Sequence, residues 1–327
     1  MPDAYQSHRL RDFEPDRLRH ALHGGEAEHI LLQPGAAGAR LRKWQGEDLT
    51  VDRGEYGFDV LARGAFRPGF VTIAFSRGAA IRQANGFAVR NEQVQLYPEG
   101  SEILYRAGAG TTWTAIQVRR EELQRRAGLQ GGRELLLPQR HALNLPAPED
   151  LPELARVVES LLDDLEAAPD AGMEKLRDAL VDSVVDALGA LSHPPDAERR
   201  ALHAHVRTQT VLEAQRLLRA RLDEPYDSAR LCRALDYPER TVELYFRQTL
   251  QISPQAWHRK ARLHRARRLL MEAGAGAGGR SVSDVALLCG FDQLGRFSVE
   301  YRRLFGEKPS ETFRRPAAGI VVPAASR

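Results

Sequence analysis

Apolar residues recur at helical spacing in the C-terminal part of the chain, and the same pattern occurs there twice. The first copy extends from Ser228 to Leu250 and the second from Ser281 to Gly306. Each copy reads as a short apolar helix, a tight turn and an amphipathic helix of about three turns, which predicts a helix-turn-helix. The intervening segment, SPQAWHRKARLHRARRLLMEA, has the composition of one continuous basic helix.

Residues 28–119 show a different pattern, in which short runs alternate apolar and polar positions. Clusters of Gly, Pro, Asn and Asp separate the runs, which are EHILLQ, ARLRKW, LTVDR, FVTIAFS, VQLY, EILYR and WTAIQV. The pattern predicts an antiparallel barrel or sandwich. A parallel sheet is disfavoured because the gaps are too short for crossover helices. Helices are expected beside the strands, over 16–22 and 120–127.

Two long amphipathic helices are predicted after the proline-rich break LPAPED. The apolar stripe of the first contains Leu151, Leu154, Val157, Val158, Leu161, Leu162 and Leu165, and that of the second contains Met173, Leu176, Leu180, Val184, Leu188 and Leu191. Two interpretations remain open: both stripes pack onto the barrel, or one pairs with the same helix of a second subunit.

A chain of 327 residues is long enough for two domains that each bury a core. The expected fold class is α+β with two domains, an N-terminal antiparallel β-barrel with two long helices and a C-terminal all-α double helix-turn-helix. The expected boundaries are 1–195 for the barrel domain, 196–206 for a linker, 207–316 for the double helix-turn-helix and 317–327 for a flexible tail. Adjacent prolines in SHPPDAER block a continuous helix and mark the linker.

Charge is divided unevenly between these parts. Residues 207–327 contain 22 Lys and Arg against 13 Asp and Glu, a net of +9, whereas residues 1–206 contain 25 against 31, a net of −6. Because attraction to phosphate supplies most sequence-independent DNA affinity, this asymmetry indicates a DNA-binding module attached to an acidic partner domain.

Cysteine content and the absence of long apolar runs indicate the compartment. Cys232 and Cys289 fall on the first helix of each helix-turn-helix, where we expect small buried thiols and no disulfide. No apolar run is long enough to span a bilayer, and the start MPDAYQSHRLRDF lacks a signal-peptide core. A cytoplasmic protein is therefore expected.

In the first helix-turn-helix, the second helix is expected to enter the major groove. The residues spaced to fill the core are Leu231, Ala234, Leu235, Tyr237, Val242 and Phe246, and those facing outward are Glu239, Arg240, Glu243, Leu244 and Arg247. Arg240 lies near the start of the helix, where side chains reach base edges, and its planar fork suits guanine. Arg247 lies further along and suits phosphate. The alternative for both is a solvated surface arginine.

The second helix-turn-helix repeats this arrangement. Its expected core is Val285, Ala286, Phe291, Phe297, Tyr301 and Phe305, and its leading face is Gln293, Leu294, Gly295, Arg296, Val299 and Glu300. Gly290 falls in the turn, where a positive φ favours glycine. Gln293 and Arg296 are candidates to read adenine and guanine, whereas Arg302 and Arg303 lie too far along the helix and suit the phosphate backbone.

These motifs together resemble the C-terminal DNA-binding domain of the AraC/XylS family of transcriptional regulators. The resemblance covers about residues 207–315 and includes ISPQAW, RLHRARRLL, DVALLCGF, FSVEYRRLFG and KPSETFRR in order. It implies control of transcription by binding two successive major grooves. It also implies that Arg240 and Glu243, and Gln293, Gly295 and Arg296, occupy base-facing positions.

Four features depart from that family pattern. Asp236 and Gln251 stand where glycine is common, and Asp tolerates the left-handed conformation only at some cost. Gly295 leaves a recognition position without a side chain, so base contact there must come from neighbours or from DNA shape. The run GAGAGG, residues 274–279, is a longer connector than usual.

The N-terminal part resembles the cupin-like sensor domain of AraC-type regulators similar to the ethanolamine-operon regulator, through HILLQPGAAGARLRKW and LYPEGSEILYRAGAGTTWTAIQV. Candidate effector-binding aromatics are Trp44, Tyr56, Phe75, Tyr97, Tyr105 and Trp113, with Phe58 and Phe70 as further aromatics; the alternative is that they fill the barrel core. His29 is the only histidine of residues 28–119, so neither a metal nor another cofactor is expected.

We therefore expect a DNA-binding regulator, an activator, whose partners are promoter DNA, RNA polymerase, a small effector and a second copy of the chain. One alternative is a regulator whose barrel only dimerises under the control of a partner protein. Another is an enzyme fused to a DNA-binding module. Residues 1–206 contain no cysteine nucleophile and no recognisable catalytic spacing, so no enzyme activity is expected.

Overall fold

The structure, a computed structural model, describes residues 4–23, 25, 27–35, 37–80, 82–130, 132, 135, 137–168, 174–274 and 280–314. Met173, the connector residues 275–279 and the expected tail over 317–327 lie outside the described residues. The chain divides into two compact units: Met1–Leu212 with Thr241–Gln251, and Glu213–Arg240 with Ile252–Arg327. No helix in the described part of the chain is long and apolar enough to cross a membrane.

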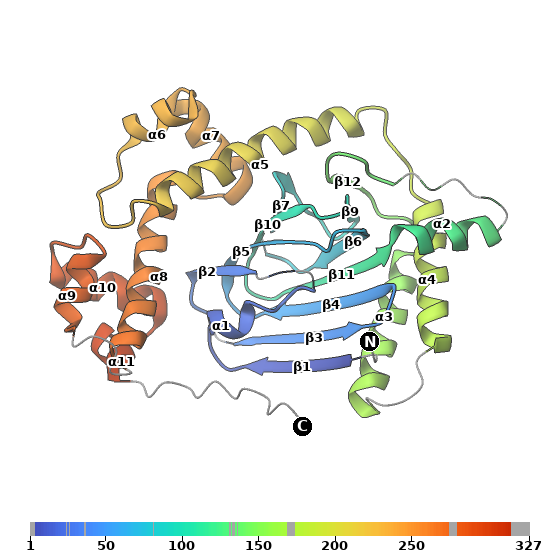
Figure 1. Ribbon diagram of the computed structural model, residues 1–327, viewed down its shortest axis with the longest axis horizontal. Coiled ribbons are helices and arrows are strands. Elements are labelled where there is room, and N and C mark those ends of the chain that lie inside the picture. The colour runs from blue at the N-terminus through green and yellow to red at the C-terminus, as the bar shows by residue number, and fades with distance from the viewer. Residues whose placement is uncertain are drawn as a thin grey trace. The chain divides into compact units, whose positions relative to one another are not determined.

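The first unit contains two antiparallel sheets (Figure 1). The seven-stranded sheet has the order β1 (Ala4–Leu10), β3 (Ala39–Gln45), β4 (Leu49–Tyr56), β11 (Thr111–Arg119), β6 (Phe70–Arg77), β9 (Gln93–Tyr97) and β12 (Leu143–Pro146). The five-stranded sheet has the order β2 (Glu28–Gln33), β5 (Asp59–Ala65), β10 (Glu102–Ala107), β7 (Arg82–Ala84) and β8 (Phe87–Ala88). The α+β class is confirmed, with the described strands in two sheets.

Each of the seven alternating runs forms a strand, but β1 did not stand out in the sequence. Its residues, AYQSHRL, lack an apolar period, yet β1 pairs with β3 along its whole length, from Ala4 opposite Gln45 to Leu10 opposite Ala39. Edge strands with one exposed side depend on backbone pairing more than on apolar pattern. The strand is therefore set by its neighbour.

In the described part of the first unit, helices begin at five places: α1 (Pro15–Leu18), α2 (Arg120–Leu129), α3 (Leu151–Ala167), α4 (Glu174–Gly189) and α5 (Ala197–Arg219). Helix α5 is continuous over most of residues 196–206, the stretch that we expect to link the two parts of the chain. Helix α4 ends at Gly189, and the two prolines lie in the segment between it and α5. The helix begins once the chain has passed Pro195, because proline is tolerated only near a helix start.

The apolar stripes of α3 and α4 belong to the core of the chain itself. Leu161 is 1% exposed and Leu180 0%, and both join one cluster with Trp44 and Ile116 of the seven-stranded sheet. Arg42 of β3 is also buried and donates hydrogen bonds to acidic side chains of α3. The interpretation in which the stripes pack onto the strands is confirmed, and the alternative of a subunit seam made by them is wrong.

The remaining helices are α6 (Ser228–Leu235), α7 (Glu239–Leu250), α8 (Pro254–Gly274), α9 (Val282–Leu288), α10 (Leu294–Phe305) and α11 (Pro309–Arg314). Helix α8 is the single continuous helix that its composition predicts. Within the second unit it contacts α9 and α11, and α10 contacts α9 and α11. These contacts give the second helix-turn-helix its frame.

Candidate nucleic-acid interface

The turn between α6 and α7 is made by a residue in the left-handed conformation. The Asp227 carboxylate caps α6 by accepting from the Arg230 N–H at 2.9 Å, and Asp236 ends the helix with φ 56°. Asp is one of the few L-residues that adopt this φ at modest cost. Leu231, Val242 and Phe246 are buried as expected, while Ala234 is exposed and does not belong to the core.

The outward face of α7 presents the side chains that its periodicity predicts. Arg240 is exposed and forms no ion pair among the described residues. Arg247 is 63% exposed and lies 3.9 Å from the Glu243 carboxylate, which is a weak surface pair. Leu244 is 49% exposed, and Glu239 also lies on the surface. Both arginines are therefore free to meet a ligand from solvent.

The turn between α9 and α10 is tightly built around Gly290. Its φ is +70°, and a Cβ placed there would lie 2.2 Å from the Asp223 carbonyl oxygen. From α8, the Arg262 guanidinium donates Nε–H to the Cys289 carbonyl at 2.7 Å, hydrogen bonds the Gly290 carbonyl, and stacks 4.5 Å from the Phe291 ring centroid. Only glycine fits this turn without displacement.

The outward face of α10 combines exposed polar and apolar positions. Gln293 stands at the N-cap position without a side-chain capping hydrogen bond. Gly295, Arg296 and Arg302 are also exposed, with nothing within 4 Å of a Cβ added at Gly295. Val299 is 68% exposed. Sequence spacing places all of these residues correctly on the surface.

Glu300 differs from the expectation that it lies on the leading face. Its side chain is 23% exposed and accepts from Arg259 of α8 at 2.5 Å and from Arg296 at 3.0 Å. Burial raises the pKa of Glu300, but the hydrogen bonds from these two arginines outweigh it and leave the pKa lowered. Glu300 thus fixes α10 to α8 and holds the Arg296 side chain in place.

Several arginines of the basic helix α8 bind other groups of the same unit instead of facing solvent, and the sequence pattern did not predict these contacts. Arg259 and Arg262 bind α10 and the α9–α10 turn, and Arg267 lies 3.5 Å from Glu307 and 5.0 Å from the Phe305 ring centroid. A count of charges cannot separate such positioning arginines from those that face solvent. The positive surface is smaller than the net charge suggests.

Of the two cysteines expected to be buried, only Cys289 is fully so. Cys289 is buried and Cys232 partly buried, and both are free thiols. Burial raises the pKa of Cys289 to about 11, so the thiol stays protonated at neutral pH.

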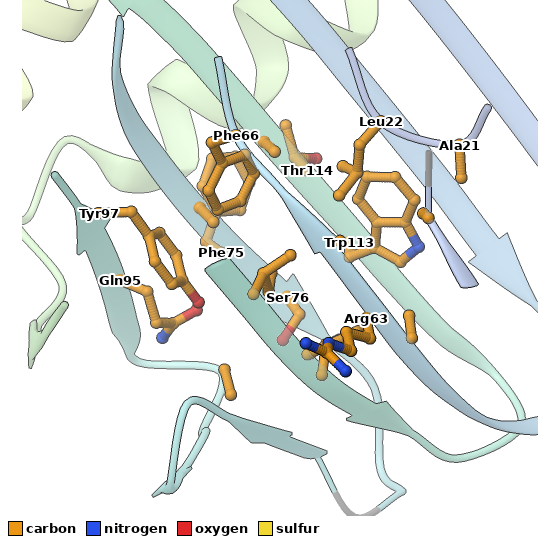
Figure 2. A pocket seen from close by; sticks show the side chains of 18 of the residues that line it. Ala21, Leu22, Arg63, Phe66, Phe75, Ser76, Gln95, Tyr97, Trp113 and Thr114 are labelled. Carbon is orange, nitrogen blue, oxygen red and sulfur yellow. The ribbon is translucent and has the colours of Figure 1, made fainter. Parts of the chain in front are cut away.

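A second candidate site is a small cavity lined by residues of both sheets, with a volume of about 40 Å³. Its lining includes the expected aromatics Tyr56, Phe75, Tyr97, Tyr105 and Trp113 together with His29, Phe66 and Gln95. Figure 2 shows Phe66, Phe75, Tyr97 and Trp113 around this space. The remaining candidate, Trp44, does not line the cavity; it lies in the core cluster that includes residues of α3 and α4. Phe58 and Phe70 do not line the cavity either.

The cavity is apolar and its histidine is neutral. The His29 ring lies 3.1 Å from the Tyr56 hydroxyl through Nε2, and burial lowers the pKa of His29 to about 4. Burial likewise raises the pKa of Tyr105 to about 12, although the Ser76 hydroxyl and Arg82 lower it. Among the described residues there is no group of three His, Cys, Asp or Glu side chains that could hold a metal ion.

Comparison with known proteins identifies the C-terminal part. Residues 231–315 match the family described as a helix-turn-helix domain. The transcriptional regulator ArgR of Pseudomonas aeruginosa is 33% identical over 104 residues, 32% of this chain and 29% of that protein. The XylDLEGF operon transcriptional activator of Pseudomonas putida is 36% identical over 75 residues, 23% of either chain.

A solved structure of a probable AraC family transcriptional regulator from Rhodopseudomonas palustris is 34% identical, with a TM-score of 0.31, over 33% of this chain and 99% of that one. The matched region thus covers less than a third of the two curated relatives described above. These relatives are regulators and not enzymes.

Proposed function

Because the C-terminal part is a helix-turn-helix domain of the AraC type, we propose that the protein is a transcriptional regulator that binds promoter DNA through α7 and α10. The observation that carries this proposal is the second recognition helix. Its outward face is exposed, while its inner face and its turn are fixed by α8 through Arg259 and Arg262. A rigid helix with a free face suits the major groove.

Within each helix, the early residues are proposed to read bases and the later residues to hold phosphate. Arg240 precedes the first buried residue of α7, whereas Arg302 lies in the last turn of α10. Bases are read by side chains near the start of a recognition helix, and backbone contacts tolerate any sequence. RNA polymerase and a second copy of the chain are the remaining proposed partners, with activation as the proposed outcome.

The test is a binding titration of the full chain against a selected duplex, its single-base variants and random duplex at two salt concentrations. Arg240→Ala should cost on the order of 1 to 3 kcal/mol on the selected duplex and relax the preference at one base pair. Arg302→Ala should weaken binding to every duplex alike and reduce the salt slope by about one charge. Equal losses on all duplexes for both variants would contradict the division of roles.

We also propose that the cavity between the sheets binds a small, uncharged effector with an aromatic or apolar body. The neutral His29 and the buried tyrosines support this class. Arg63 also lines the cavity, but it is already paired with Glu102 at 3.1 Å, so an ionic ligand would lose its hydration without gaining an unpaired counter-charge. A thermal-shift screen of the full chain should compare neutral aromatics with amines, amino alcohols, sugars and aromatic acids. Ala115→Leu, which fills the cavity, should abolish the shift produced by any true ligand.

A further inference from the structure

The two recognition helices share an exposed apolar side chain at the same register. Val242 is the first buried residue of α7 and Phe297 the first of α10, and two positions later stand Leu244, 49% exposed, and Val299, 68% exposed. Five positions after its first buried residue, each helix also carries an exposed arginine: Arg247 in α7 and Arg302 in α10. The register of the two outward faces is therefore the same.

A single exposed apolar residue on a protein surface needs no explanation. Two at matched positions, on faces whose other exposed side chains are mostly Glu, Arg and Gln, do need one. Valine is also a poor helix former, since its branched Cβ loses rotamer freedom in a helix. Helix propensity and solvation thus both disfavour Val299 where it stands.

The hydrogen-bonding capacity of α10 is reduced around this residue. Gly295 offers no side chain, and Arg296 is held by Glu300, which is itself anchored to Arg259 of α8. Leu294, 39% exposed, adds a second apolar side chain to the start of the helix. At Val299, the middle of α10 therefore offers DNA an apolar contact.

In the major groove, the C5-methyl group of thymine is the apolar feature that distinguishes one base from the others. We infer that Leu244 and Val299 each contact the methyl group of a thymine. Each half-site, meaning the stretch of base pairs that one recognition helix contacts, then contains one position read without a hydrogen bond. This inference rests on the proposed function, because it requires α7 and α10 to enter the groove.

Deoxyuridine provides a direct test, since it lacks only the methyl group and keeps the pairing and hydrogen-bonding atoms of thymine. A duplex is first recovered from a random-sequence pool with the full chain, and its thymines are then replaced one at a time by deoxyuridine. Loss of one buried methyl group should weaken binding by roughly fourfold, at one position in each half-site.

The variants assign each position to its residue. At the sensitive position of one half-site, Val299→Ala should bind the duplex with thymine and the duplex with deoxyuridine with equal affinity. Leu244→Ala should show the same equality at the sensitive position of the other half-site. Leu287→Ala is the matched control, because Leu287 is 58% exposed but lies on α9; it should retain the fourfold ratio at both positions.

Several outcomes would overturn the inference. If Val299→Ala and Leu244→Ala keep the wild-type ratio at every thymine, these side chains do not read methyl groups. If Val299→Ala leaves DNA affinity unchanged and reduces transcription, the residue contacts a protein partner instead. Failure to recover any preferred duplex would contradict the proposed function itself. That result differs from the two outcomes above, in which a preferred duplex is recovered and only the roles of Leu244 and Val299 are refuted.

Discussion

Replacing Gly290 with alanine should lower the free energy of unfolding, and Gly306 of the same unit provides the comparison that sets the expected magnitude. Gly290 and Gly306 have nearly equal φ, +70° and +76°. An alanine in the left-handed region costs about 1 to 2 kcal/mol. At Gly306 nothing lies within 4 Å of the added Cβ, so Gly306→Ala should cost only that amount.

Gly290→Ala should cost more, because its Cβ would also meet fixed atoms. The Asp223 carbonyl oxygen would lie at 2.2 Å and the Arg262 guanidinium at 2.6 Å. Overpacking of this kind adds about 1 to 3 kcal/mol, so we expect a total loss of roughly 2 to 5 kcal/mol. The displaced turn should also misplace α10 and reduce DNA affinity.

The assay is urea unfolding of the full-length variants together with hydrogen exchange on peptides from α8, α9 and α10. Exchange reports the local free energy of opening and isolates the unit that contains both glycines. A loss for Gly290→Ala no larger than that for Gly306→Ala would refute the reasoning, because it would show that the Asp223 and Arg262 contacts do not constrain the turn.

Two further predictions concern the first unit. Because the folded-state pKa of His29 is about 4, below its ordinary value near 6.5, the unfolded chain binds an extra proton between these pH values. The free energy of unfolding should therefore fall as pH drops from 6.5 toward 4, and His29 should contribute about 1.4 kcal/mol per pH unit to that slope. His29→Gln should remove this contribution, whereas His203→Gln, a surface control, should keep it. Equal slopes in the two variants would contradict the prediction. Leu161→Ala should cost about 2 to 5 kcal/mol, whereas Leu202→Ala, 47% exposed, should stay within about 0.5 kcal/mol, and a small loss for Leu161→Ala would place it outside the core.

Local patterns predicted the helices of the C-terminal part well, because each one has an apolar face and a turn residue of its own. Asp236 and Gln251, noted as departures from glycine, do adopt positive φ, 56° and 57°. The role of Glu300 could not be predicted, since its partner Arg259 lies 41 residues away in sequence. Pairings of that kind depend on packing between helices and leave no period in the chain.

The N-terminal part was predictable in class but not in detail. Alternation indicated the strands β3 and β11 without telling which face meets the cavity; Trp113 of β11 lines the cavity, whereas Trp44 of β3 packs in the core. Both are buried, at 8% and 0% exposure, and both follow the same period. A sheet covered on both faces hides the difference, because each face is apolar.

The most direct test of the central claim is selection of duplexes from a random pool by the full chain, followed by sequencing. Two recognition helices that enter successive major grooves should select two conserved blocks whose centres lie about 10 to 10.5 base pairs apart. Arg240→Ala should then blur one position in one block and leave the other block intact. A single conserved block, or no preference beyond that of random duplex, would contradict the account.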